Sequence, residues 1–241
     1  MHVVQFKNGS TPIELISRTT VPGPERQLVE AFIAYVPGCL RWTAGAVAVF
    51  HEPQLESGFP DLVVVHYRPE RFRQWPKVRF GLEPLDLKVL HHLHQVGGAD
   101  ATHLMKKLGL DAKRLLSSIE RLTDARLVGR SGGAWCTEPL CRTFGVQDIV
   151  AIEAKIKNWR DAFHQGRLNQ WFASESYILS PVEKPRRQVL ERAWRFGVGI
   201  YLVNGEHVRR VCSARKTRIP LCYGSWLFNE WVGRYLHRRL L

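Results

Sequence analysis

The sequence of 241 residues has no long hydrophobic run and no regular cysteine pattern. No apolar stretch approaches the roughly 20 residues needed to span a bilayer. The first ten residues mix His, Gln, Lys and Asn with few apolar positions and do not resemble a signal peptide. Five cysteines, odd in number and irregularly spaced, argue against a disulfide framework. These absences predict a cytoplasmic protein with no membrane partner.

Acidic residues are also in short supply. Asp and Glu number 22 against 35 Lys and Arg, which gives a formal net charge of +13. Such an excess favours polyanionic partners, because Lys and Arg displace condensed counterions from a phosphate backbone. The alternative is a basic soluble protein without a nucleic-acid partner. A hydrophobic content of 45% is ordinary for a globular protein with a substantial core.

Strand-like and helical segments alternate at both ends of the chain and predict an α/β fold. Short apolar runs bounded by turn residues indicate strands, and apolar residues at helical spacing indicate helices. We expect strands at about 46–50, 62–67, 149–156, 176–179, 197–203 and 207–211. We expect helices over 24–36, 159–173, 182–196 and 224–241.

The middle of the chain, residues 83–140, has a different character. Three helical segments are followed by a glycine turn and a β-hairpin, with Asp111 as the N-cap of the third helix. This order resembles a winged helix-turn-helix. Five polar residues of the third helix are expected outside its apolar stripe, as a helix laid in a major groove requires; the alternatives are a solvated face and a surface for protein contacts. They are Lys113, Arg114, Ser117, Ser118 and Arg121.

Two carboxylates lie on either side of this middle segment, each next to or within a predicted strand. Asp61 immediately precedes the strand at 62–67, while Glu153 and Lys155 interrupt an apolar run. Side chains alternate along a strand, so Glu153 and Lys155 share a face. Mg²⁺ takes one or two carboxylates, so adjacent strands would let Asp61 and Glu153 hold the ion while Lys155 assists a water. The alternative is a surface pair of Glu153 and Lys155 on an edge strand.

Pro60-Asp61 followed by Glu153-Ala154-Lys155 resembles the PD-(D/E)xK nuclease superfamily. The resemblance covers 24–67 and 149–203. It implies a restriction-endonuclease-like core, a mixed sheet flanked by helices, with the winged-helix segment inserted into it. Asp61 and Glu153 are much further apart than is common in that family, and the insertion accounts for most of the gap.

The same resemblance implies two supporting residues. Members of the family often carry a Glu near the metal on the first helix. Glu25 matches it better than Glu30, because Glu25 shares a face with Leu28 and Phe32. Many members also place a Gln on the helix after the Lys, and Gln165 occupies that position.

The expected organisation is a discontinuous nuclease-like domain, 1–75 and 145–241, around an inserted domain, 83–140. The expected function is a Mg²⁺-dependent endonuclease, with Mn²⁺ as an alternative ion, that hydrolyses phosphodiester bonds in double-stranded DNA. The winged helix would aid DNA binding or site choice. Two alternatives stay open: a DNA-binding transcriptional regulator with an inactive nuclease-like scaffold, and an RNA-directed nuclease. A homodimer is the default for an enzyme that cuts both strands.

Overall fold

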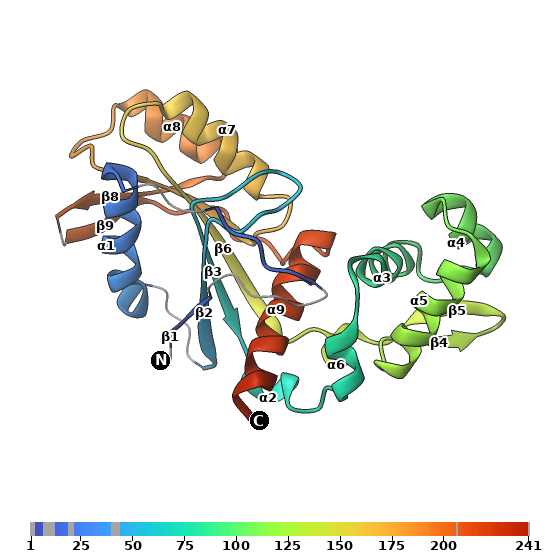
Figure 1. The fold of residues 1–241 in the computed structure, drawn as a ribbon. Coiled ribbons are helices and arrows are strands. Elements are labelled where there is room, and N and C mark those ends of the chain that lie inside the picture. Colours follow the sequence, from blue (N-terminus) through green and yellow to red (C-terminus); the bar gives the residue numbers. More distant parts are fainter. Residues whose placement is uncertain (1–2, 7–12, 19–21, 40–43, 206, 241) are drawn as a thin grey trace. The chain divides into compact units, whose positions relative to one another are not determined.

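The computed structural model describes residues 3–6, 13–18, 22–39, 44–205 and 207–240. Contacts divide the chain into two units, whose elements are labelled in Figure 1. Unit 1 comprises Met1–Gly9, Leu15–Tyr67 and Val146–Pro220, and unit 2 comprises Ser10–Glu14, Arg68–Gly145 and Leu221–Leu241.

Unit 1 contains a mixed sheet. In the described part of the chain its seven strands follow the order β1-β2-β3-β6-β7-β8-β9. β2, β3 and β6 pair antiparallel, and β6, β7 and β8 pair parallel, while β1 joins β2 in parallel and β9 joins β8 antiparallel. The strands are β1 (Val3–Phe6), β2 (Ala46–His51), β3 (Leu62–Tyr67), β6 (Val146–Ala154), β7 (Glu175–Ser180), β8 (Gly199–Asn204) and β9 (His207–Cys212). The expected α/β class is confirmed, and β1 is a strand that the apolar pattern did not predict.

Helices cover both faces of this sheet (Figure 1). α1 (Pro24–Cys39) packs on one face, and α7 (Trp159–Asn169) and α8 (Arg187–Phe196) pack on the other. The alternation of side chains explains the division, because Tyr177 and Leu179 belong to the core under α1 while Ile178 belongs to the core under α7 and α8.

Three helix boundaries differ from expectation. α8 begins at Arg187 rather than at 182 because Pro185 disfavours helical backbone in the residue before it. α7 ends at Asn169 rather than at 173, and the Asn158 side chain caps its start by accepting from the Asp161 N–H. α1 continues to Cys39 although Pro37 and Gly38 were expected to end it.

Unit 2 is mainly helical and carries one β-hairpin. The Asp111 side chain accepts a hydrogen bond from the Arg114 N–H at 2.8 Å, so the expected N-cap is confirmed. Gly132 and Gly133 both have positive φ in the hairpin turn, which requires left-handed backbone. The elements are α2 (Pro69–Phe72), the 3₁₀ helix η1 (Lys77–Gly81), α3 (Pro84–Val96), α4 (Ala101–Leu108), α5 (Ala112–Asp124), β4 (Val128–Ser131), β5 (Ala134–Thr137), α6 (Leu140–Thr143) and α9 (Tyr223–Leu240).

The segment between β3 and β6 leaves and rejoins the sheet at neighbouring points. Tyr67, the last residue of β3, pairs with Val146, the first residue of β6. The Arg68 N–H then donates to the Gly145 carbonyl at 3.1 Å. The insertion therefore adds chain to a β-hairpin without separating its two strands.

Among the described residues, no helix combines the length and apolarity that crossing a bilayer requires.

A buried ion pair ties α9 to the rest of unit 2. Arg79 Nη2 lies 2.6 Å from Glu230 Oε1, and the side chains are 2% and 0% exposed. Arg79 also donates to the Thr143 carbonyl at 2.7 Å, and Asn229 accepts from the Gly145 N–H at 2.9 Å. These contacts explain why α9 groups with unit 2, whereas the sequence pattern had placed it in the nuclease-like domain.

Glu230→Ala is expected to lower the free energy of unfolding by about 3–5 kcal/mol, because it leaves the Arg79 guanidinium buried without its carboxylate. Urea denaturation followed by circular dichroism measures the change. Glu191→Ala is the matched control, since Glu191 forms an exposed helical pair with Arg187 worth about 0.3–0.5 kcal/mol. Equal losses of unfolding free energy in the two variants would contradict a stabilising role for the buried pair of Arg79 and Glu230.

Candidate active site

The register of two antiparallel strands brings the predicted carboxylates together. Leu62 pairs with Ile152, so extending the register by one residue puts Asp61 opposite Glu153. Asp61 Oδ2 accepts a hydrogen bond from the Ala154 N–H at 2.7 Å. Two residues far apart in the sequence are thereby held as neighbours within unit 1.

Glu153 is a buried carboxylate with one oxygen unpaired. The residue is 2% exposed, and its Oε1 accepts a hydrogen bond from Asn169 Nδ2 at 2.7 Å. Its Oε2 is also buried, and no hydrogen-bond donor in the described residues reaches it. Burial, together with the negative charge of Asp61, raises the pKa of Glu153 to about 8. A cation at this position would satisfy the unpaired oxygen and favour the ionised form.

Asp61 and Lys155 form the outer part of the site. Burial raises the pKa of Asp61 above its ordinary value, while the Lys155 ammonium and the Ala154 N–H oppose that rise. Lys155 Nζ lies 3.9 Å from Asp61 Oδ2 and 3.9 Å from Glu25 Oε2. Glu25, in the first turn of α1, therefore reaches the site, whereas Glu30 bonds to the exposed Arg26 at 2.7 Å.

α7 carries two amide side chains one helical turn apart, of which Asn169 contacts a residue of the site. Gln165, which the family resemblance implied, has a buried Oε1 without a hydrogen-bond partner in the described part of the chain. Asn169, which sequence reasoning missed, makes the contact to Glu153. The sequence does hold a signal for Asn169: it lies four residues after Gln165, and residues four apart on a helix share a face.

A second carboxylate near Asp61 was also missed. Glu52, the residue after β2, is 5% exposed and pairs with Arg18 at 2.6 Å. Its N–H donates to the Asp61 carbonyl at 3.2 Å, and its charge adds to the effects that raise the pKa of Asp61. The position of Glu52 follows from the pairing of His51 with Leu62, which sequence patterns do not reveal.

The five polar residues predicted to face DNA on α5 of unit 2 have different surroundings. Lys113 and Arg114 are exposed and Ser117 is half-buried. Ser118 is fully buried, so its expected place on the exposed face is wrong: it lies in the same stripe as Leu115 and Leu122. Arg121 binds both carboxylate oxygens of Asp86 at 2.8 Å and is committed to that pair.

The donor set of the site fits a hard divalent cation. No group of three or more His, Cys, Asp and Glu side chains suited to a metal occurs among the described residues. Mg²⁺ usually takes one or two carboxylates and completes its shell with water, so Asp61 and Glu153 suffice. The unpaired Oε2 of Glu153 is the observation that supports this fit.

Comparisons with known proteins add little to this description. No family model matches the chain. No curated protein matches it either. Among solved structures, a protein of unknown function from Silicibacter pomeroyi is similar at 18% identity and a TM-score of 0.26, over 40% of this chain and 67% of that chain. A likeness at that TM-score carries no argument about fold or function.

Glu153→Gln is expected to change how the stability of the metal-free protein depends on pH. A carboxyl whose pKa is raised by folding stabilises the protein at low pH, and this stabilisation disappears as the pH rises through the folded value. The melting temperature of the metal-free protein should fall as the pH rises towards about 8, the pKa of Glu153. Glu153→Gln should reduce that fall and melt higher than wild type at alkaline pH.

Thermal melts in a chelating buffer across this pH range provide the measurement. Glu30→Gln is the control, because Glu30 lies on the exposed side of α1 in a pair with Arg26. If wild type and Glu153→Gln keep a constant difference in melting temperature at every pH, the raised pKa of Glu153 is refuted.

Proposed function

We propose that this protein is a metal-dependent nuclease of the PD-(D/E)xK type, which hydrolyses phosphodiester bonds in double-stranded DNA. The observation that carries the proposal is the juxtaposition of Asp61 with a buried Glu153 whose Oε2 is unpaired. Burying a charged carboxylate costs free energy unless a partner offsets its lost hydration. Groups whose pKa is strongly shifted in this way concentrate at functional sites.

The arrangement of the core supports the same proposal. The order α1, β2, β3, β6, α7, β7 is the one that the superfamily resemblance implies. β6 lies between β3 and β7 in the sheet, so Glu153 is not on an edge strand. The alternative of a surface ion pair on an edge strand therefore loses its premise.

Asp61 and Glu153 would hold Mg²⁺, or Mn²⁺, through their carboxylates. When bound, such an ion polarises the phosphate and lowers the pKa of a coordinated water. Asn169 fixes the orientation of Glu153 through its hydrogen bond. Lys155 offers a positive charge to the attacking water or to the developing charge on the phosphate, and Glu25 holds the ammonium from the side of α1.

Unit 2 would act as the DNA-binding part. Its order α3, α4, α5, β4, β5 is that of a winged helix-turn-helix, and α5 would be the recognition helix. Lys113 and Arg114 are the exposed cations on its first turn, and Ser117 lies one turn further. Because Ser118 is buried and Arg121 is bound to Asp86, these three residues make up the revised contact surface.

Cleavage assays on plasmid DNA and on RNA with Mg²⁺ or Mn²⁺ test the enzyme. Asp61→Asn, Glu153→Ala and Lys155→Ala should each lower the rate by about 10²–10³-fold, a typical loss when a group that stabilises developing charge is removed. Glu30→Ala is the control on α1 and should cut like wild type. Tight duplex binding without cleavage under either ion would favour the regulator, and cleavage of RNA alone would favour the RNA-directed nuclease.

A separate experiment addresses α5. Lys113→Glu and Arg114→Glu should weaken duplex binding and reduce the slope of log affinity against log salt by about 0.9 for each phosphate that the variant no longer binds. Arg142→Glu is the control, because Arg142 is an exposed residue of α6 that lies beside Glu138. Fluorescence anisotropy with labelled duplex gives both quantities. An unchanged salt slope in the α5 variants would remove α5 from the DNA interface.

A further inference from the structure

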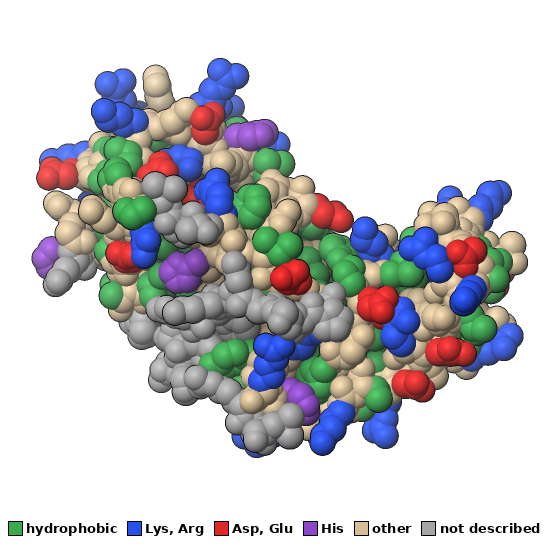
Figure 2. All heavy atoms as spheres, viewed as in Figure 1, with side chains coloured by type: hydrophobic (Ala, Val, Ile, Leu, Met, Phe, Trp, Pro, Cys, Tyr) green, Lys and Arg blue, Asp and Glu red, His purple; other side chains and the backbone are tan. Residues whose placement is uncertain are grey.

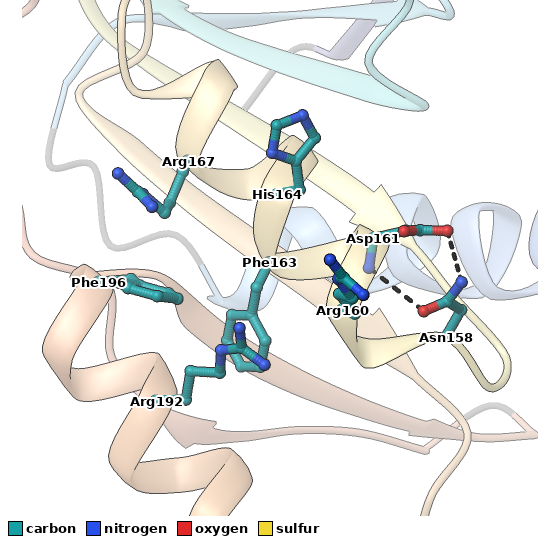
Figure 3. Close-up of a pocket in the computed structure, with 8 residues that line it drawn as sticks. All are labelled: Asn158, Arg160, Asp161, Phe163, His164, Arg167, Arg192 and Phe196. Atoms are coloured by element: carbon teal, nitrogen blue, oxygen red, sulfur yellow. Dashed lines mark hydrogen bonds between the residues drawn. The ribbon is translucent and has the colours of Figure 1, made fainter.

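A hollow of about 560 Å³ lies between α7 and α8 in unit 1 (Figure 3). Phe163 and Phe196 provide its apolar surface, and Arg160, His164, Arg167 and Arg192 surround it. Figure 2 shows that Lys and Arg side chains predominate over these two helices. We refer to this hollow as the α7–α8 groove.

The groove is on the opposite face of α7 from the candidate active site. Gln165 and Asn169 share one face of the helix, and Asn169 reaches Glu153. Arg160, His164 and Arg167 fall on the other side of the same helix by its 3.6-residue period. The groove is therefore a distinct feature and does not share side chains with the carboxylate site.

Two of the three arginines of the groove, Arg167 and Arg192, contact aromatic rings and not carboxylates. The guanidinium carbon of Arg192 lies 5.6 Å from the centroids of both Phe163 and Phe196, and that of Arg167 lies 4.8 Å from Phe196. Such cation–π contacts orient a guanidinium without neutralising its charge. Within the described residues, no carboxylate lies at ion-pair distance from Arg160, Arg167 or Arg192.

The acidic residue that lines the groove bonds to a neutral amide and to none of the groove's arginines. Asp161 accepts a hydrogen bond from the side-chain amide of Asn158, and its N–H donates back to Asn158 Oδ1 at 3.3 Å (Figure 3). By contrast, Arg187 on the same helix α8 bonds to Glu191 at 2.7 Å. The groove thus has a surplus of positive charge, with three arginines against one aspartate, whereas Arg187 has a carboxylate partner of its own.

We propose that the α7–α8 groove binds the phosphate backbone of the DNA strand that the candidate active site cuts. Guanidinium groups match phosphate oxygens with paired N–H donors, and three of them on two helices suit a chain of phosphates better than a single anion. That the bound polymer is DNA rests on the proposed function. That the groove binds anions follows from its own residues.

A strand that contacts both places has to pass around α7, which stands between them. A helix with its side chains is about 10–12 Å across, so the groove and the carboxylates are separated by at least that width. Phosphates along one strand of a duplex rise about 3.4 Å per nucleotide, so roughly three or more nucleotides cover this distance. The groove would therefore contact phosphates a few nucleotides from the cut and set a minimum length of substrate.

The test measures binding separately from cleavage. Labelled duplexes of increasing length are titrated by fluorescence anisotropy in EDTA against full-length protein carrying Glu153→Gln. In that background, Arg167→Glu and Arg192→Glu, each made singly, should lower the affinity for long duplexes at least tenfold and reduce the salt slope by about 0.9 for each phosphate no longer bound. Arg187→Glu, on the same helix but outside the groove, is the matched control. Circular dichroism melts of each variant exclude unfolding as the cause.

Each outcome decides the proposal. A loss of affinity confined to the groove variants, and absent for duplexes too short to reach the groove, supports it. A loss equal to that of Arg187→Glu overturns it, as does full displacement of the duplex from the groove by millimolar inorganic phosphate, which would show a site for a single anion. If groove-dependent binding persists but wild type cleaves nothing, only the proposed nuclease activity fails.

Discussion

The pairing of β3 with β6 is the constraint on which the candidate site depends. It matches Leu62 with Ile152 and so leaves Asp61 opposite Glu153, where the Ala154 N–H bonds to the Asp61 carboxylate. A slip of one residue would turn every side chain of β6 to the other face of the sheet. Glu153 would then enter the apolar layer under α1, so the packing of that layer also protects the site.

Burial of Glu153 links the site to the helix behind it. A carboxylate in this environment needs a donor or a cation, and Asn169 of α7 satisfies only one of its oxygens. Without a cation beside it, Glu153 has a pKa raised to about 8 and so keeps its proton at neutral pH. α7 therefore has two roles: its inner face positions Glu153, and its outer face, with α8, presents uncompensated arginines to solvent.

Much of the fold could be predicted because apolar periodicity is a local property. The strands at 46–51 and 62–67 and the capped start of α5 follow directly from the residues present. Errors arose where local signals compete or are absent. Pro185 delays the start of α8. Ser118 lies in the buried stripe of α5, although its polar side chain predicts an exposed position.

Local patterns in the chain were enough to identify most strands and helices, and the acidic, basic and amide residues that stand next to them. They also distinguished 83–140 from its surroundings. The meeting of Asp61 with Glu153 was expected from the family resemblance alone, whereas the hydrogen bond from Asn169 and the grouping of α9 with Arg79 became visible only in three dimensions. These neighbours are set by strand register and by buried pairs between distant segments, and no local pattern encodes either of them.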